Sequence, residues 1–489
     1  MHHITGILRE QITMFPESVD EYITAENPVR FIEEFAEGLD VVAHGFQHAL
    51  LPETGRPPYS PKDLLKLYCY GFLNRIFSSR RLERETTRNL ELFWLLKKLS
   101  PDHKTISDFR KNNADALSLV FKEFLRLCNT LELFSKELAG IDSTKFKAQN
   151  ARDRIKDAKG VDNSIARINE SITEYLHLLD ENDSTDDCLE VTMGSPLTKE
   201  ELQKKLTYLK EQRTKLETAK TDLEKTGETY ISLTDPDCRL IKDRQGIEPA
   251  YRMHTATDSK HSLIVDFDVT NDAADSNHLF SLAMSAKTTL GVETITVCAD
   301  AGFYDSVELK QCEDNKITTY APIPEQKVSK KTNVPTPEYR HVKFHYDAAS
   351  DTYRCPEGQT LHRYSRRRRK EDQRLSYIYR TERCTDCQAR KFCTTSRTHG
   401  RYVYRWEYEA TIDRLKERLN NHPEIVKRRK AIVEHPYGTI KRIWGYGTFL
   451  LKGLKKIKIE ATLINLAYNM KRVLSIKGTI AMINALQAR

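Results

Sequence analysis

The sequence predicts an α/β protein whose mixed-sheet core is combined with an N-terminal helical domain, a helical-hairpin insertion and a small cysteine-rich insertion. Two apolar stretches that read as strands each lead to an aspartate, Asp142 and Asp300, and helical patterns alternate with the strand patterns between and after them. Strands that alternate with helices favour a mixed α/β sheet. We expect a helical domain at 1–135, the first part of the core at 136–324, the cysteine-rich insertion at 325–405, and the last core helix with a basic tail at 406–489.

The composition indicates a large globular protein with an excess of basic residues. The chain has 489 residues, enough for several domains, with 39% hydrophobic and 30% charged residues and a net charge of +8. The segment from Arg401 to Arg489 holds 19 basic and 7 acidic residues, a net +12 that exceeds the excess of the whole chain. A nucleic-acid partner or a solvated basic face would explain it. No stretch resembles a signal peptide or membrane span, so we expect a cytoplasmic, DNA-associated protein without a membrane partner.

The first 135 residues read as helices. An amphipathic run covers Val29–Leu39, and Ser60 with Pro61 forms an N-cap and first-turn pair that opens Lys62–Leu73. A further helical run covers Ser79–Leu99, and Thr105 or Ser107 can cap the next helix. A helix, a short turn and a basic helix could read DNA, and an ordinary helical bundle is the alternative.

Two insertions are predicted. Residues 160–226 carry apolar positions three and four apart in two runs, which indicates an antiparallel, coiled-coil-like hairpin. In the second insertion, Cys355, Cys384, Cys387 and Cys393 suit a structural zinc site, while thiols without metal or an iron–sulfur cluster are the alternatives. The six scattered cysteines are expected to be reduced packing residues.

The remaining core elements follow in order. A β-hairpin is expected from Tyr251–Thr257 and His261–Thr270, and Asp275 can cap a helix that ends near Leu290. The strand that ends at Asp300, a helix over Ser306–Asp314 and a strand over Ile317–Tyr320 complete the pattern.

Three carboxylates are the candidate catalytic and metal-binding residues: Asp142, Asp300 and Glu434. The two aspartates are expected at strand ends, and neighbouring parallel strands would bring them together. Phosphodiester cleavage needs an activated oxygen nucleophile and a stabilised leaving oxygen, which two divalent ions can supply. Carboxylates suit Mg²⁺ or Mn²⁺. Glu434 follows an apolar stretch that would pack on the sheet, so its charge would be desolvated without a cation. Glu424 begins the same helix, where the helix dipole alone favours an acid.

Basic residues surround Glu434. Lys441 lies seven positions beyond it, and with Arg428, Arg429 and Arg442 it could hold DNA phosphates near the site. Pro436 makes a continuous helix up to Lys441 doubtful.

Seven motifs resemble bacterial insertion-sequence transposases of the DDE class, whose core is RNase H-like. They are YSPKDLLKLYCYGFLNRIFSSRRLE with SPDHKTISDFRK, IDSTKFKAQNA, TDPDCRLIKDRQG, VTNDAADSNHL, ADAGFYDS and IVEHPYGTIKRIWGYG. The resemblance implies that Asp142, Asp300 and Glu434 bind catalytic metal ions. It also implies binding to terminal inverted repeats and target DNA, strand cleavage and strand transfer, by a homodimer or larger synaptic complex. Related transposases carry Tyr and Arg before the Glu, where this chain has Lys427 and Lys430.

Two other functions fit the same residues. A host-adopted DNA-binding protein without catalysis would bind DNA but fail to nick it in the presence of metal. A metal-dependent nuclease would nick DNA without transferring the strand to a second duplex. The intact set of three acids favours the transposase.

Overall fold

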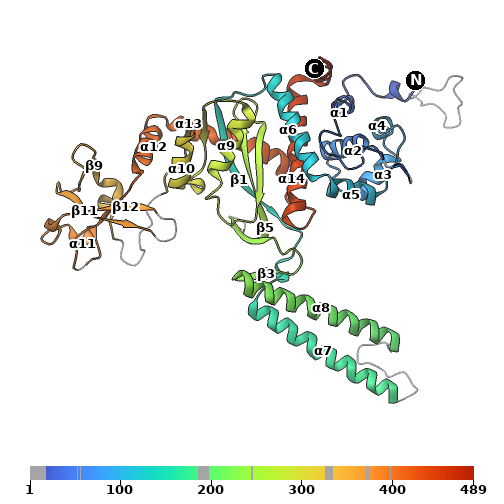
Figure 1. The fold of residues 1–489 in the computed structure, drawn as a ribbon, viewed down its shortest axis with the longest axis horizontal. Coiled ribbons are helices and arrows are strands. Elements are labelled where there is room, and N and C mark those ends of the chain that lie inside the picture. The colour runs from blue at the N-terminus through green and yellow to red at the C-terminus, as the bar shows by residue number, and fades with distance from the viewer. Residues whose placement is uncertain are drawn as a thin grey trace, which may run out of the picture.

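The computed structural model describes residues 18–488 apart from 52, 55–56, 185–197, 244–245, 325–333, 370–373 and 397. Figure 1 shows an N-terminal group of helices packed beside a central sheet, a second small sheet at the far end, and a long helical hairpin that projects from the core. Cys188 lies outside the described residues, and the five other scattered cysteines are buried, as expected. No helix among the described residues is both long and apolar enough to span a bilayer.

The N-terminal group contains six α-helices and a short 3₁₀ turn. They are η1 Val19–Tyr22, α1 Pro28–Glu37, α2 Pro61–Leu73, α3 Ser79–Thr86, α4 Leu90–Leu95, α5 His103–Asn112 and α6 Ala114–Thr130. The expected single run over Ser79–Leu99 is wrong, because Asn89 begins a new helix by accepting hydrogen bonds from the backbone of Glu91 and Leu92. Asp102, rather than Thr105 or Ser107, caps α5 in the same way.

The central sheet is mixed, as predicted. Its strands are β1 Leu138–Lys147, β4 Arg239–Asp243, β5 Gly246–Asp258, β6 Ile264–Thr270, β7 Ile295–Cys298 and β8 Ile317–Tyr320. The order is β4-β5-β1-β7-β8, with β6 also paired to β5. β5 runs antiparallel to β1, β4 and β6, whereas β7 runs parallel to β1 and β8. The expected β-hairpin is therefore confirmed as β5 and β6.

Strand β1 does not end at Asp142, which corrects the expected strand end. It continues to Lys147, and Asp142 sits opposite Thr255 in the middle of the antiparallel pairing with β5. The polar residues after Asp142 look like a turn in sequence, but β5 pairs with them residue by residue. Non-local pairing therefore overrides the local pattern.

Helices cover the sheet around β1 and β7. They are α9 Leu279–Leu290, α10 Ser306–Asp314, α12 Glu409–Asn421, α13 Pro423–Tyr437 and the π-helix η7 Gly438–Ile443. Helix α13 passes through Pro436 and ends one residue later at Tyr437, where the π-helix η7 begins without a gap, so the chain stays helical up to Lys441 but changes its helix type beside the proline. Helix α13 crosses β1 at Gly140, where an added Cβ would lie 2.7 Å from Val433 Cγ1. Glycine thus permits the close approach.

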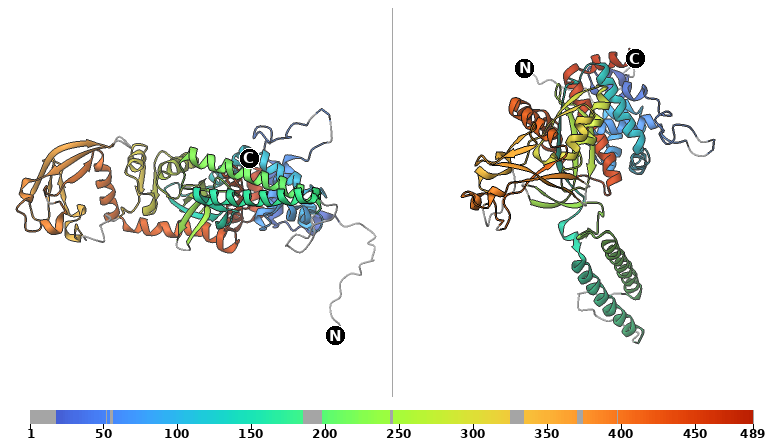
Figure 2. Two further views of the ribbon diagram at one scale, coloured as in Figure 1. Left: turned by 90° about the horizontal axis from the view of Figure 1, so that it is seen from below. Right: turned by 60° about the vertical axis from the view of Figure 1, so that its left-hand side comes forward.

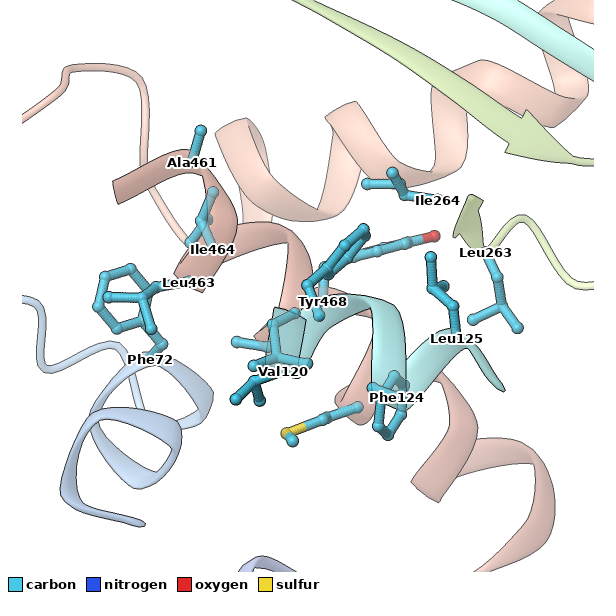
Figure 3. Packing of buried hydrophobic residues seen from close by; sticks show 14 of the residues in the cluster. Phe72, Val120, Phe124, Leu125, Leu263, Ile264, Ala461, Leu463, Ile464 and Tyr468 are labelled. Carbon is cyan, nitrogen blue, oxygen red and sulfur yellow. The ribbon is translucent and has the colours of Figure 1, made fainter. Parts of the chain in front are cut away.

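The basic tail contains a helix whose central part is buried. Helix α14 (Leu454–Lys477) is buried on all sides from Ile459 to Met470 and packs against α2, α6 and β6, and α15 (Thr479–Gln487) follows it. Figure 3 shows Ala461, Leu463, Ile464 and Tyr468 of this helix between residues of the N-terminal helices and residues of the sheet. A helix that is buried on all sides belongs in a core. Its lysines are confined to the two ends, and the buried side chains of Glu460 and Asn469 are hydrogen-bonded.

Two segments project from this core (Figure 2). Helices α7 (Ala158–Ser184) and α8 (Lys199–Thr226) form the hairpin, joined at its base by the strand pair β2 (Ile155–Asp157) and β3 (Tyr230–Ser232). The second sheet has the order β13-β12-β11-β10-β9. Its elements are β9 His345–Asp347, β10 Thr352–Arg354, β11 Thr360–Arg368, β12 Leu375–Arg380, β13 Val403–Trp406 and α11 Arg390–Cys393. The remaining 3₁₀ turns are η2 Arg152–Arg154, η3 Ala301–Phe303, η4 Pro337–Tyr339, η5 His341–Lys343 and η6 Glu382–Cys384.

Candidate active site

Two of the three predicted carboxylates meet at the centre of the sheet. Strands β1 and β7 are parallel neighbours with Gly140 opposite Cys298, so Asp142 and Asp300 each lie two residues beyond the same paired position. Asp300 caps η3, because its Oδ1 accepts a hydrogen bond from the backbone of Gly302 at 2.7 Å. Parallel pairing therefore brings the two aspartates together, as the sequence predicted.

The side chain of Asp142 is partly buried, which disfavours the charged form of its carboxyl group. Its side chain is 21% exposed, and its Oδ2 lies 2.9 Å from Nη1 of Arg429 on α13. Burial raises the pKa of Asp142 to about 6; Arg429 acts against this rise, and the nearby Asp300 carboxylate adds to it. A second positive charge beside Asp142 would offset the part of the cost of burying its carboxylate that Arg429 does not offset.

Glu434 is not desolvated, which corrects the reason for choosing it. Its side chain is 64% exposed and lies 3.6 Å from Nζ of Lys430 on the same helix. Ile432 and Val433 pack on the sheet as expected, but each helical position turns about 100° from the one before it, so Glu434 lies beside the contact face. Within the described part of the chain, no three acidic, histidine or cysteine side chains are grouped closely enough to hold a metal ion.

Helix α13 is attached to the sheet by hydrogen bonds on both sides of Asp142. The Tyr437 hydroxyl lies 3.1 Å from the carbonyl oxygen of Asp142 and accepts a hydrogen bond from Thr255 Oγ1 at 2.8 Å. Beyond it, Lys441 Nζ donates to Thr144 Oγ1 at 3.1 Å and to the Lys145 carbonyl at 2.8 Å. These contacts hold the segment that carries Glu434 against β1.

The four basic residues expected to contact DNA have different environments. Arg428 and Arg442 are exposed. Arg429 is partly buried against Asp142, and Lys441 is partly buried against β1. In this structure, two of the four residues therefore point toward solvent while the other two are engaged with the sheet.

A polar cluster beside the aspartates was missed in the sequence. Asp275 does not cap α9, whose N-cap is His278. Instead, Asp275 accepts a hydrogen bond from Ser143 Oγ and forms an ion pair with Arg252 at 3.1 Å. Its Oδ2 and Asp300 Oδ1 lie 3.1 and 2.9 Å from the position that a Gly302 Cβ would occupy. Asp275 is thus a third acid near the two aspartates, and its signal in sequence was the motif VTNDAADSNHL.

His254 completes this cluster from β5. It is fully buried, its Nδ1 lies 3.7 Å from Asp275 Oδ1, and its ring lies 4.3 Å from that of His278. Burial, with the charges of His278 and Arg252, lowers the pKa of His254 to about 3, so the imidazole is neutral at physiological pH. Because His254 is neutral, the positive charge that pairs with the Asp275 carboxylate in this cluster is that of Arg252.

The four clustered cysteines line one cavity of the second sheet, between β10 and α11. All four are free thiols, and Cys355 Sγ accepts a hydrogen bond from the backbone of Gln359 at 3.3 Å. Burial raises the pKa of Cys393 to about 11, with further upward contributions from the other three cysteines. The four thiols therefore line one cavity, although in the described residues they are not grouped closely enough to hold a metal ion.

Family models match both ends of the chain. Residues 17–112 match a family described as a transposase domain (DUF772), and residues 354–474 match a family described as a transposase DDE domain. The second match includes Glu434 and Lys441, and the first covers most of the N-terminal helices. The chain is a DDE-type transposase of the insertion-sequence kind.

Other comparisons add little to this identification. A cryo-EM structure of a piggyBac transposase synaptic complex with hairpin DNA is similar at 8% identity and a TM-score of 0.30, over 95% of this chain and 80% of that one. This score is too low to support an argument. No curated protein matches the chain. The family itself makes DNA the partner of this transposase and implies that its chemistry depends on divalent metal ions.

Proposed function

We propose that this transposase cleaves DNA at terminal inverted repeats and transfers the strand to target DNA, with Asp142, Asp300 and Glu434 as its catalytic carboxylates. The observation that carries the proposal is the adjacent pair Asp142 and Asp300, in which burial and the second carboxylate raise the pKa of Asp142. Two acids held together at the middle of a sheet favour an oxygen-seeking cation between them.

The two aspartates fit a hard divalent ion, because both offer oxygen ligands and the pKa of Asp142 stays raised despite its ion pair with Arg429. We propose two Mg²⁺ or Mn²⁺ ions, which would activate the attacking oxygen and stabilise the leaving oxygen. Arg429 would keep Asp142 oriented, and Asp275 with Ser143 and Arg252 would position β1 and β5 beside it. Glu434 would supply its carboxylate from α13 as the third ligand.

The remaining parts of the proposal concern architecture. The order β6-β5-β1-β7-β8, antiparallel on one side of β1 and parallel on the other, supports an RNase H-like core. The N-terminal helices would contact DNA, with Arg428 and Arg442 at phosphates near Glu434 and the protein acting as a cytoplasmic homodimer or larger synaptic complex. The four thiols around one cavity support a structural zinc ion.

A cleavage and joining assay tests this function. The full-length protein is incubated with a duplex that carries the element's end and with a second target duplex, with Mg²⁺, with Mn²⁺ or with chelator. We expect metal-dependent nicking and strand joining, and Asp300→Asn should lose both while retaining DNA affinity. Nicking without joined product would make the protein a nuclease, and metal-independent binding without nicking would make it a DNA-binding protein.

A further inference from the structure

We propose that strands β11 and β12 form a second DNA-binding surface, which holds the phosphates of double-stranded DNA far from the two aspartates. We call the paired residues 363–368 and 375–380 the arginine ribbon. The proposal rests on the proposed function only in taking DNA as the polyanion. Figure 1 shows the ribbon in the small sheet at the end of the molecule opposite the N-terminal helices.

The ribbon and its connection carry an excess of positive charge. The sequence 360–383 contains eight arginines and Lys370 against three acids, Glu371, Asp372 and Glu382. Arg366, Arg367 and Arg368 follow one another on β11 and are all exposed. None of the three has a carboxylate partner among the described residues. Like charges on neighbouring positions repel, so an external anion would stabilise them.

The geometry makes the charge accessible on both faces and along an edge. Strand β10 pairs only with 360–362 of β11, and within the described residues no strand pairs with the outer edge of 363–368. Arg366 lies opposite Tyr377 and Arg367 opposite Ser376, so consecutive arginines point to opposite faces. A partner that wraps the ribbon could contact all three.

Arginines at the base of the ribbon are already ordered. The Arg363 guanidinium lies 3.6 Å from the centre of the Tyr377 ring, and that of Arg380 lies 3.6 Å from the centre of the Tyr364 ring. His362, Arg363, Tyr364 and Arg380 line a groove along one side of the sheet. Stacking fixes each guanidinium plane, which lowers the entropy lost when a phosphate binds. Arg363 also lies 3.6 Å from Asp351, so Arg380 is the better placed of the two for an external anion.

Double-stranded DNA fits this surface in shape and charge. The major groove admits a two-stranded β-ribbon, and guanidinium groups bind phosphate oxygens through paired hydrogen bonds. The competing explanation is that the arginines only prevent edge-to-edge association of β11, since charged residues commonly protect exposed strand edges. The two explanations predict opposite results for DNA affinity.

The test uses the full-length protein with Arg366→Gln, Arg367→Gln and Arg368→Gln combined. Binding to a fluorescent duplex is measured at several salt concentrations, on end-containing and on unrelated DNA. Each lost phosphate contact reduces the slope of log affinity against log salt by about 0.9, so we expect a reduction of about 2.7 and an equal loss on both duplexes. The matched control replaces the exposed Lys204, Lys210 and Lys215 of α8 with glutamine, which removes the same charge.

Each outcome decides the proposal. A weaker salt dependence in the ribbon variant but not in the α8 variant supports it. Equal changes in both variants would show a general effect of net charge and overturn it. Unchanged DNA affinity together with self-association in sedimentation would establish edge protection instead. Because binding is measured without cleavage, failure of the proposed catalysis leaves this readout intact.

Discussion

The hydroxyl of Tyr437 lies 3.1 Å from the carbonyl oxygen of Asp142. Tyr437 is three residues after Glu434 on the same helix. One residue thus connects the strand that carries the first candidate acid with the helix that carries the third. The hydroxyl also lies 3.2 Å from the Met253 carbonyl on β5, and burial raises the pKa of Tyr437 well above its usual value. It remains a neutral hydrogen-bonding group at any working pH.

Tyr437→Phe should weaken this connection while keeping the ring. Thr255 loses its acceptor, so we expect the free energy of unfolding to fall by about 1–2 kcal/mol. A small displacement of α13 would reduce DNA nicking by about tenfold to 100-fold. Urea unfolding and a nicking time course measure the two effects. Unchanged nicking at reduced stability would show that the bond serves folding alone.

Gly140→Ala should push α13 away from β1. The added methyl would lie 2.7 Å from Val433 Cγ1 and 3.1 Å from Ile432 Cγ2, and both side chains are buried. We expect a loss of about 1–3 kcal/mol in stability and a loss of nicking. Gly438→Ala is the matched control, because an added Cβ there meets nothing within 4 Å and the backbone is helical. Equal behaviour of both variants would contradict the close packing.

Asp142→Asn should stabilise the metal-free protein while removing nicking. The pKa of Asp142 is raised from 3.8 to about 6 in the folded state, so the folded protein binds its proton more tightly than the unfolded chain. Stability from this group is therefore present at acid pH and lost as pH rises from 4 through 6. Above that range the ionised form costs on the order of 2–3 kcal/mol, which asparagine avoids.

Chemical denaturation at two pH values measures this difference. The asparagine variant should exceed the parent in stability at pH 8 but not at pH 4, with chelator present in both cases. A parent that gains stability relative to the variant as pH rises would show that Arg429 fully compensates the buried charge.

Glu434→Gln should abolish metal-dependent nicking and leave folding and DNA binding intact. Because the side chain is exposed, its replacement costs little stability, so a loss of nicking reports on catalysis. Glu424→Gln is the matched control: Glu424 lies at the start of the same helix, is equally exposed at 60%, and hydrogen-bonds His422. Robust nicking by the Glu434 variant would remove this residue from the candidate site.

Zinc analysis tests the cysteine cluster. The purified protein should contain about one zinc ion per chain, and Cys387→Ser should lose it together with the fold of the second sheet. Asp386→Asn changes an exposed neighbour in the same loop and should retain the metal. A fully folded, metal-free parent protein would contradict the zinc site.

Sequence patterns were sufficient where local and tertiary preferences agree. The strand before Asp300 and the position of Asp300 near Asp142 follow from the sequence, because apolar runs that end in polar residues mark buried parallel strands. The β5–β6 hairpin follows its local turn signal, and α10 follows a local capping signal at Asp305.

Other features depend on contacts between distant segments. Asp275 has the local sequence of a helix cap, yet Ser143 and Arg252 engage it across the sheet. The continuation of β1 beyond Asp142 depends on pairing with β5 about a hundred residues later. The exposure of Glu434 follows from the helical period relative to Val433, so this error was avoidable. For α14, the terminal lysines suggested exposure, whereas residues 459–470 are buried on every side and the polar ones among them depend on partners from other segments, such as Ile264 for Asn469.

The position of α14 has a consequence for synthesis of the chain. Helices α2 and α6 and strand β6 all pack against this helix, yet it follows every one of them in the chain. The N-terminal helices and the sheet therefore cannot complete their packing until residues near Met470 have been synthesised. A chain terminated before Leu454 would lack the element that joins both halves, so such a truncated protein would not acquire the assembled site.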